Sequence, residues 1–94
     1  MIIGALTVEL QVPYSHSLKE KRSVRESLIS KLRRDFNIAI AEIDNQDSWQ
    51  LLTLAVVSVS NDKAYLQGLL DHVLNTIEEN RRDVILLDYE MEII

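Results

Sequence analysis

The sequence predicts a single α+β domain with the element order βαββαβ. Two stretches, from Leu18 to about Phe36 and from Asn61 to about Asn80, repeat apolar residues at helical spacing. Four others are β-branched or alternate between apolar and polar residues, which is typical of strands. They cover residues 2–12, 38–43, 49–60 and 83–94. Because the chain has only two glycines, one proline and no linker-like segment, we expect one domain over residues 1–94.

Each strand shows which of its faces is expected to meet the core. The first strand carries one apolar set, Ile2, Leu6, Val8, Leu10 and Val12, and places polar side chains opposite it. The last strand carries another, Ile85, Leu87, Tyr89, Met91 and Ile93, opposite Asp88, Glu90 and Glu92. Residues 49–60 are apolar on both faces, which is typical of a central strand.

Local signals mark where each helix starts and which face it buries. Ser17 is a predicted N-cap with Glu20 as its capping-box partner, and Asn61 is the predicted cap of the second helix. The first helix then has an apolar stripe of Val24, Leu28, Leu32 and Phe36, with Ile29 beside it. The second has Leu66, Leu69, Leu70, Val73 and Ile77. Each helix therefore has one side to bury.

Two such helices and four such strands are most simply buried with both helices on one face of an antiparallel sheet. Right-handed crossovers then favour the ferredoxin-like sandwich, with strand order 4-1-3-2. This order places the first and third strands, the two most hydrophobic, in the centre of the sheet.

Composition excludes several classes of function. The chain has no cysteine and only two histidines, His16 and His72, far apart in sequence, so we expect no metal site and no cofactor. His16 lies beside serines in the loop before the first helix, but adjacency in sequence makes no catalytic triad, and we expect no catalytic residues. The N-terminus does not resemble a signal peptide and no segment is apolar enough to cross a bilayer, which predicts a cytoplasmic protein without membrane contact.

Positive charge is concentrated in the first predicted helix. Residues 17–36 hold seven of the ten basic residues against three acidic ones, a net charge of +4, whereas the rest of the chain has a net charge of −9. The candidate contacts for phosphate or a partner are Lys19, Lys21, Arg22, Arg25, Arg33 and Arg34. A basic helix on an acidic protein indicates a partner approached from one side. The alternative is an ordinary solvated helix face with internal ion pairs.

Two of these cations are placed unusually for a solvated helix. Lys19, Arg22 and Arg33 point away from the apolar stripe, but Lys21 and Arg25 fall inside the apolar sector. They either extend their heads to the rim of the domain, form a cationic pocket for an anion near the loop at 13–17, or pair with an acidic residue. Since acidic residues are abundant, we favour a salt bridge, either internal or to another subunit.

The series SLKEKR…SL…KLR…FN…AE…QD.WQ, followed by LAVVSVSND, resembles the YlxP-like family of small bacterial proteins of uncharacterised function. The resemblance covers nearly the whole chain and implies a ferredoxin-like fold in a bacterial cytoplasmic protein. Family members tend to be encoded beside translation and ribosome-maturation factors, which suggests contact with RNA or the ribosome. The family supplies no catalytic residues.

The first hypothesis for function is a non-enzymatic module that touches RNA or a ribosomal particle through its basic helix. Carboxylates on the open sheet face argue against base stacking there. The second is a protein-interaction or self-associating domain, a homo-oligomer for example, that uses a sheet face or an edge strand. Trp49 is expected to pack in the core or at the rim, with an anchor for a protein contact as the alternative. The third is a small-anion-binding regulatory module.

Overall fold

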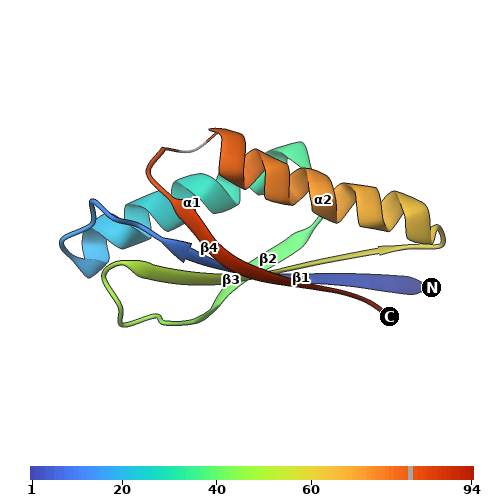
Figure 1. Cartoon of the computed structure of the whole chain (residues 1–94), viewed down its shortest axis with the longest axis horizontal. Coiled ribbons are helices and arrows are strands. Elements are labelled where there is room, and N and C mark those ends of the chain that lie inside the picture. The colour runs from blue at the N-terminus through green and yellow to red at the C-terminus, as the bar shows by residue number, and fades with distance from the viewer. Residues whose placement is uncertain (81) are drawn as a thin grey trace.

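A computed structural model describes residues 1–80 and 82–94 and confirms the predicted architecture. Two helices cover one face of a four-stranded antiparallel sheet (Figure 1). The elements are β1 (Ile2–Gln11), α1 (Leu18–Asp35), β2 (Ala39–Asp44), β3 (Leu51–Ser60), α2 (Lys63–Asn80) and β4 (Ile85–Ile93). The strand order is β2-β3-β1-β4, so β1 and β3 are central as their hydrophobicity predicts.

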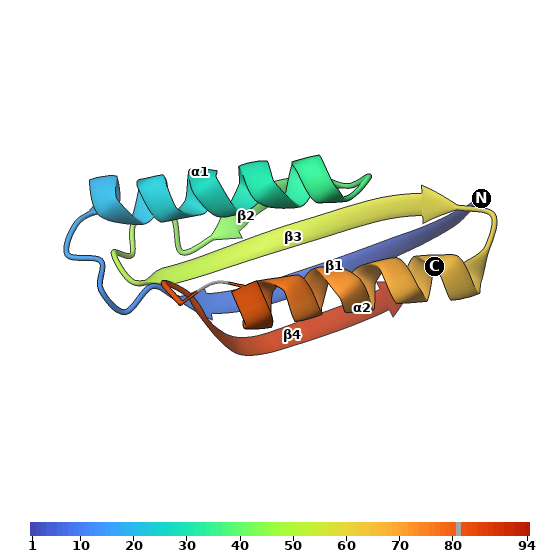
Figure 2. The ribbon, with the colours of Figure 1, turned by 90° about the horizontal axis from the view of Figure 1, so that it is seen from above.

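The core lies between the sheet and the two helices. Leu6 pairs with Val56 and Val8 with Leu54, and all four side chains are buried beneath the helices. Leu28 and Leu32 of the predicted stripe are buried, with Val24, Ile29 and Phe36 packed beside them. Seen from above, α1 runs over the β2 side of the sheet and α2 over the β4 side (Figure 2).

The two helix starts differ in detail from the sequence prediction. Ser17 caps α1, because the Glu20 amide donates to its hydroxyl, but the Glu20 carboxylate accepts from the amide of His16 rather than that of Ser17. Asp62, not Asn61, caps α2: the Tyr65 amide donates to Asp62 Oδ1 at 3.1 Å. Asp and Asn are comparable N-caps, so the sequence alone could not separate neighbours at 61 and 62.

The last strand departs from its predicted alternation at one point. Asp88 pairs with Glu9 and Leu86 pairs with Leu10, so an irregularity in the ladder leaves Leu87 without a partner in the register. Leu86 therefore packs against the core, while Ile85 and Leu87 are exposed, and their assignment to the core face was wrong. A bulge inserts one residue and reverses the faces on one side of it.

At Gly4 the strand β1 lies close against α2. A Cβ atom there would lie 2.8 Å from Leu66 Cγ and 2.9 Å from Leu70 Cδ1, and both leucines are fully buried. The missing side chain therefore lets α2 lie directly on the strand. Gly68, in contrast, is a glycine in a helix whose Cβ would meet no atom within 4 Å.

The two glycines should respond oppositely to alanine. We expect Gly4→Ala to lower the free energy of unfolding by about 1–3 kcal/mol, because it overpacks the strand–helix contact. Gly68→Ala should raise it by roughly 0.5–1 kcal/mol, because alanine favours the helix and has room there. Urea denaturation of both variants tests this; a stabilising Gly4→Ala would mean that α2 does not lie on β1 as described.

Candidate interaction surface

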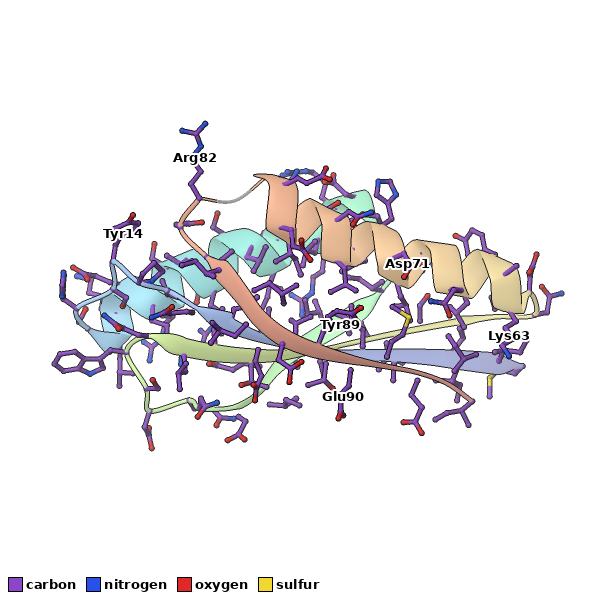
Figure 3. The ribbon with its side chains drawn as sticks, in the orientation of Figure 1. Tyr14, Lys63, Asp71, Arg82, Tyr89 and Glu90 are labelled. Atoms are coloured by element: carbon purple, nitrogen blue, oxygen red, sulfur yellow. The ribbon has the colours of Figure 1, made fainter. Side chains whose placement is uncertain are left out.

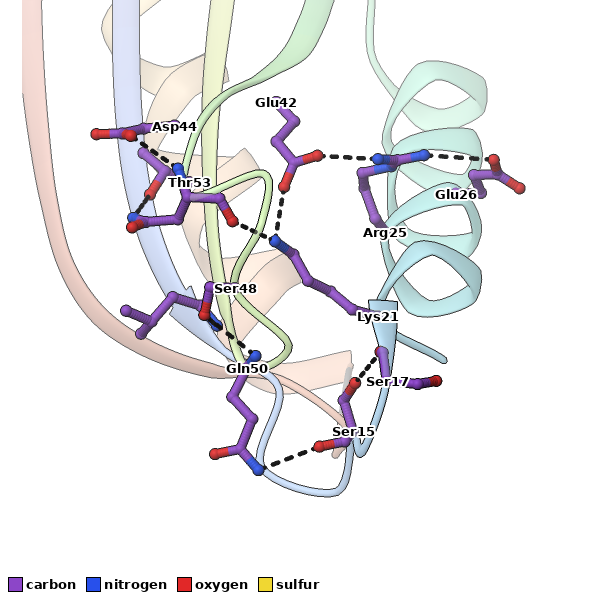
Figure 4. Close-up of polar contacts among 12 residues, drawn as sticks. Ser15, Ser17, Lys21, Arg25, Glu26, Glu42, Asp44, Ser48, Gln50 and Thr53 are labelled. Atoms are coloured by element: carbon purple, nitrogen blue, oxygen red, sulfur yellow. Dashed lines mark hydrogen bonds and ion pairs between the residues drawn. The ribbon is translucent and has the colours of Figure 1, made fainter. Parts of the chain in front are cut away.

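The basic side chains of α1 divide into an inner and an outer group. Lys21 belongs to the inner group, with its side chain only 3% exposed. Its Nζ donates to the backbone carbonyl of Asn45 at 2.6 Å and lies 3.0 Å from Glu42 Oε2 on β2 (Figure 4). The Oε2 contact is an ion pair without hydrogen-bond alignment, since Oε2 is buried and has no hydrogen-bond partner among the described residues.

Arg25 lies one turn further along α1 and pairs with the other carboxylate oxygen of Glu42. Its Nη1 donates to Glu42 Oε1 at 2.9 Å, and its Nη2 lies 3.4 Å from the exposed carboxylate of Glu26. Two cations inside the apolar sector thus hold one carboxylate that is itself only 7% exposed. The sequence favoured a salt bridge, either internal or to another subunit, and the structure shows the internal one, to the protein's own Glu42.

Two opposed effects set the pKa of Glu42. Burial acts to raise it, while the contacts from Lys21 and then Arg25 act to lower it. The cations outweigh burial, so the pKa lies below the ordinary value of 4.5. Folding therefore favours the charged carboxylate. The resulting stabilisation is complete above the unfolded-state pKa and is lost as the pH falls through the folded-state value.

We predict that Glu42→Gln lowers the free energy of unfolding by about 3–5 kcal/mol at pH 7, because it leaves Lys21 buried beside a neutral group. The difference from wild type should shrink as the pH falls below 4.5. Urea denaturation across this range measures both effects. The control is Glu26→Gln, which alters an exposed carboxylate on the same guanidinium and should cost less than about 0.5 kcal/mol. Equal effects of the two variants would contradict the buried pairing.

The C-terminal part of α1 holds cations in intermediate positions. Arg33 is exposed, as predicted, and its Nη2 donates to the backbone carbonyl of Ile40 on β2 at 3.1 Å. Arg34 Nε lies 3.7 Å from Asp35, which also accepts a hydrogen bond from Lys31 at 3.0 Å. That hydrogen bond and the nearby positive charges lower the pKa of Asp35. Arg33 therefore both contacts the edge strand and faces solvent.

Lys19 and Arg22 form the outer group together with the exposed Arg33 and Arg34. Lys19 and Arg22 lie in the first turns of α1, both are exposed, and neither has an ion-pair partner among the described residues. Ser23 and Ser30 are exposed on the same helix. Of the six candidate residues, the structure thus brings Lys21 and Arg25 onto Glu42 and leaves four facing solvent.

The opposite side of the molecule has the opposite charge. Two adjoining hollows of about 200 and 420 Å³ lie over β1 and β4. Their linings include four carboxylates, Glu9, Asp88, Glu90 and Glu92. None of the four strands contains a lysine or arginine. This face would repel phosphate, so the positive side of the domain is the outer side of α1.

Two loops meet at the end of the domain where α1 begins. One joins β1 to α1 and carries Tyr14; the other joins β2 to β3 and carries Trp49. Both aromatic side chains are largely exposed. The sequence drew attention to Trp49 but missed Tyr14, whose only signal was its place in a polar loop. The second histidine, His72, packs edge-on against Phe36, with ring centroids 5.2 Å apart.

Comparison with known proteins places the chain in a family. The family model described as a protein of unknown function (DUF503) matches residues 3–91. The chain belongs to the DUF503 family. It is also 32% identical over 77 residues to the uncharacterized protein YlxP of Bacillus subtilis (strain 168), covering 82% of this chain and 84% of that protein.

The fold recurs in a protein of unrelated sequence. The de novo designed protein Foldit4 superposes with a TM-score of 0.53 at 11% identity, covering 98% of this chain and 96% of that one. At this identity the likeness concerns the fold alone. In the described part of the chain, no group of three or more His, Asp or Glu side chains could hold a metal ion. Within the same residues, neither helix has the length and apolarity needed to span a bilayer.

Proposed function

We propose that this DUF503 domain is a non-enzymatic binding module that contacts RNA phosphates, on a ribosomal particle for example, through the outer face of α1. The main support for this proposal is that the cations of α1 fall into a group paired with a carboxylate and a group that faces solvent unpaired. Lys21 and Arg25 are paired with Glu42, whereas Lys19 and Arg22 have no acidic partner among the described residues. Such unpaired cations bind phosphate without first breaking an internal salt bridge.

The outer face has the residue types that contact nucleic-acid backbones. Lys19 and Arg22 are three residues apart, which places them on the same side of the helix about 4.5 Å apart along its axis. Arg33 follows about 16 Å further along the same axis. Exposed hydroxyls of Ser23 and Ser30 accompany them. Arginine, lysine and serine side chains make many of the contacts to phosphate oxygens in nucleic-acid complexes.

The charge of the whole domain would orient it on a polyanion. The net charge is −5, yet most of the exposed cations among the described residues lie on α1, and the carboxylates of β4 lie on the open sheet face. A phosphate-rich surface therefore attracts one side of the molecule and repels the other. Weak, strongly salt-dependent binding in one orientation is the expected behaviour.

A second candidate function, protein interaction or self-association, is favoured by a different surface. The outward face of β3 carries Leu51, Val57 and Val59, and all three are exposed. Their apolar character helped to predict a central strand, but no helix or loop among the described residues covers them. This sheet face would bury its apolar area against another protein or a second copy.

The test of RNA contact is a pair of charge reversals with the same change in net charge. Arg22→Glu should weaken binding of purified ribosomal subunits or labelled RNA, and should reduce the slope of log affinity against log salt by roughly one unit. Lys63→Glu is the control, because Lys63 lies at the opposite end of the domain from Tyr14 and the start of α1 (Figure 3). Fluorescence anisotropy over a salt series gives both quantities.

Two outcomes would reject RNA contact through α1. One is an equal loss of affinity in both variants, which would indicate a response to net charge alone. The other is unchanged binding by Arg22→Glu when circular dichroism shows an intact fold. Salt-independent self-association, measured by analytical ultracentrifugation, would instead support the exposed face of β3 as the interaction surface.

A further inference from the structure

Two large aromatic side chains are exposed in the two loops that meet at the end of the domain where α1 begins, the same end that carries Lys19 and Arg22. Tyr14 is 75% exposed and Trp49 is 56% exposed. Tyr14 lies four residues before the first turn of α1 and points outward from that end of the domain (Figure 3). Trp49 adjoins Gln50, whose backbone and side chain both bond the Tyr14 loop.

The two loops that present these rings are held by hydrogen bonds. Gln50 Nε2 donates to the carbonyls of Pro13 and Ser15, on either side of Tyr14, at 3.3 and 3.1 Å. The Val12 amide donates to the Gln50 carbonyl at 2.7 Å. The buried Ser15 donates in turn to the carbonyl of Ser17, the cap of α1 (Figure 4). These hydrogen bonds hold the Tyr14 loop against the start of α1.

The loop that carries Trp49 is anchored in the same way. The amides of Gln50 and Leu51 both donate to Ser48 Oγ, at 3.4 and 3.0 Å. Ser48 donates its own amide to the carbonyl of Asn45, and Asn45 Nδ2 donates to Thr53 of β3. Rings on ordered loops bind a partner at a smaller entropic cost than rings on mobile ones.

We infer that this end of the domain binds single-stranded RNA, with unpaired bases stacked on Trp49 and Tyr14 and the neighbouring phosphates held by Lys19 and Arg22. The inference rests on the proposed function and narrows its ligand class. Unpaired bases stack on aromatic side chains, whereas the base faces of an A-form duplex are covered by their neighbours.

The charged side chains near the rings indicate where the phosphate backbone of the RNA runs and where its bases lie. Asp44 ends β2 and Asp47 lies in the turn before Trp49, and both carboxylates repel phosphate. The backbone therefore runs along the first turns of α1 and its bases reach the rings from that side. Unpaired cations at the same end of the domain as the rings favour a polyanion over an apolar protein partner.

Trp49 is the only tryptophan, so the intrinsic fluorescence of the full chain reports on this ring alone. Titration with a single-stranded RNA of roughly 12 nucleotides should quench this fluorescence to saturation, and the matching duplex should not. Trp49→Ala and Tyr14→Ala should each bind a labelled single strand about 5- to 150-fold more weakly, with an unchanged salt slope. Tyr65→Ala, which removes a ring 57% exposed on α2, is the control and should bind like wild type.

The outcomes distinguish this inference from the function on which it rests. If Arg22→Glu weakens RNA binding while Trp49→Ala and Tyr14→Ala do not, phosphate contact stands and base stacking is rejected. If no RNA binds at all, both are rejected. Equal binding of duplex and single strand also overturns the stacking inference. So does quenching that depends on protein concentration in the absence of RNA, because the ring would then be at a protein–protein contact.

Discussion

The buried carboxylate of Glu42 is the constraint around which α1 and the edge of the sheet are arranged. It lies on β2, the short edge strand. From α1, Lys21 Nζ lies 3.0 Å from its Oε2 and Arg25 Nη1 lies 2.9 Å from its Oε1. Removing a carboxylate and an ammonium from water costs several kcal/mol each, so such a group persists only when its partners are placed well. Lys21 also bonds the Asn45 carbonyl and Arg33 bonds that of Ile40. Polar contacts thus tie the helix to its strand.

This arrangement determines which charges remain for a partner. A helix with seven basic residues would suggest one broad cationic surface, but its inner cations are already used to hold β2. The cationic surface that faces solvent is narrower. It consists of Lys19 and Arg22 at the start of α1, with Arg33 and Arg34 near its end. The start of the helix is also where the two ordered loops present their aromatic rings, so charge and stacking surface occur together at one end of the domain.

The features that could be predicted from the sequence are those that depend on local periodicity. The stripe through Leu28 and Leu32, the cap at Ser17 and the unusual placement of Lys21 beside that stripe all follow from residue spacing. The central position of β1 follows from its hydrophobicity and from the handedness of the crossovers. The position of Leu87 could not be predicted, because a bulge depends on pairing between two strands. The same holds for the ordered loop around Tyr14, since Gln50 reaches it across more than thirty residues of sequence. Glu42 could be expected to have a cationic partner only once the helix had been placed over β2.

The central claim is that neighbouring lysines of one helix have different roles, Lys21 inside and Lys19 outside. The most direct measurement is the free energy of unfolding of Lys21→Met and Lys19→Met, each compared with wild type in urea at pH 7. Both substitutions keep an unbranched side chain and remove one charge. We expect Lys21→Met to lower the free energy of unfolding by about 3–5 kcal/mol, because it leaves a buried carboxylate with one cation fewer. Lys19→Met should change it by no more than about 0.5 kcal/mol. Similar values for the two variants would show that Lys21 and Lys19 do not have different roles.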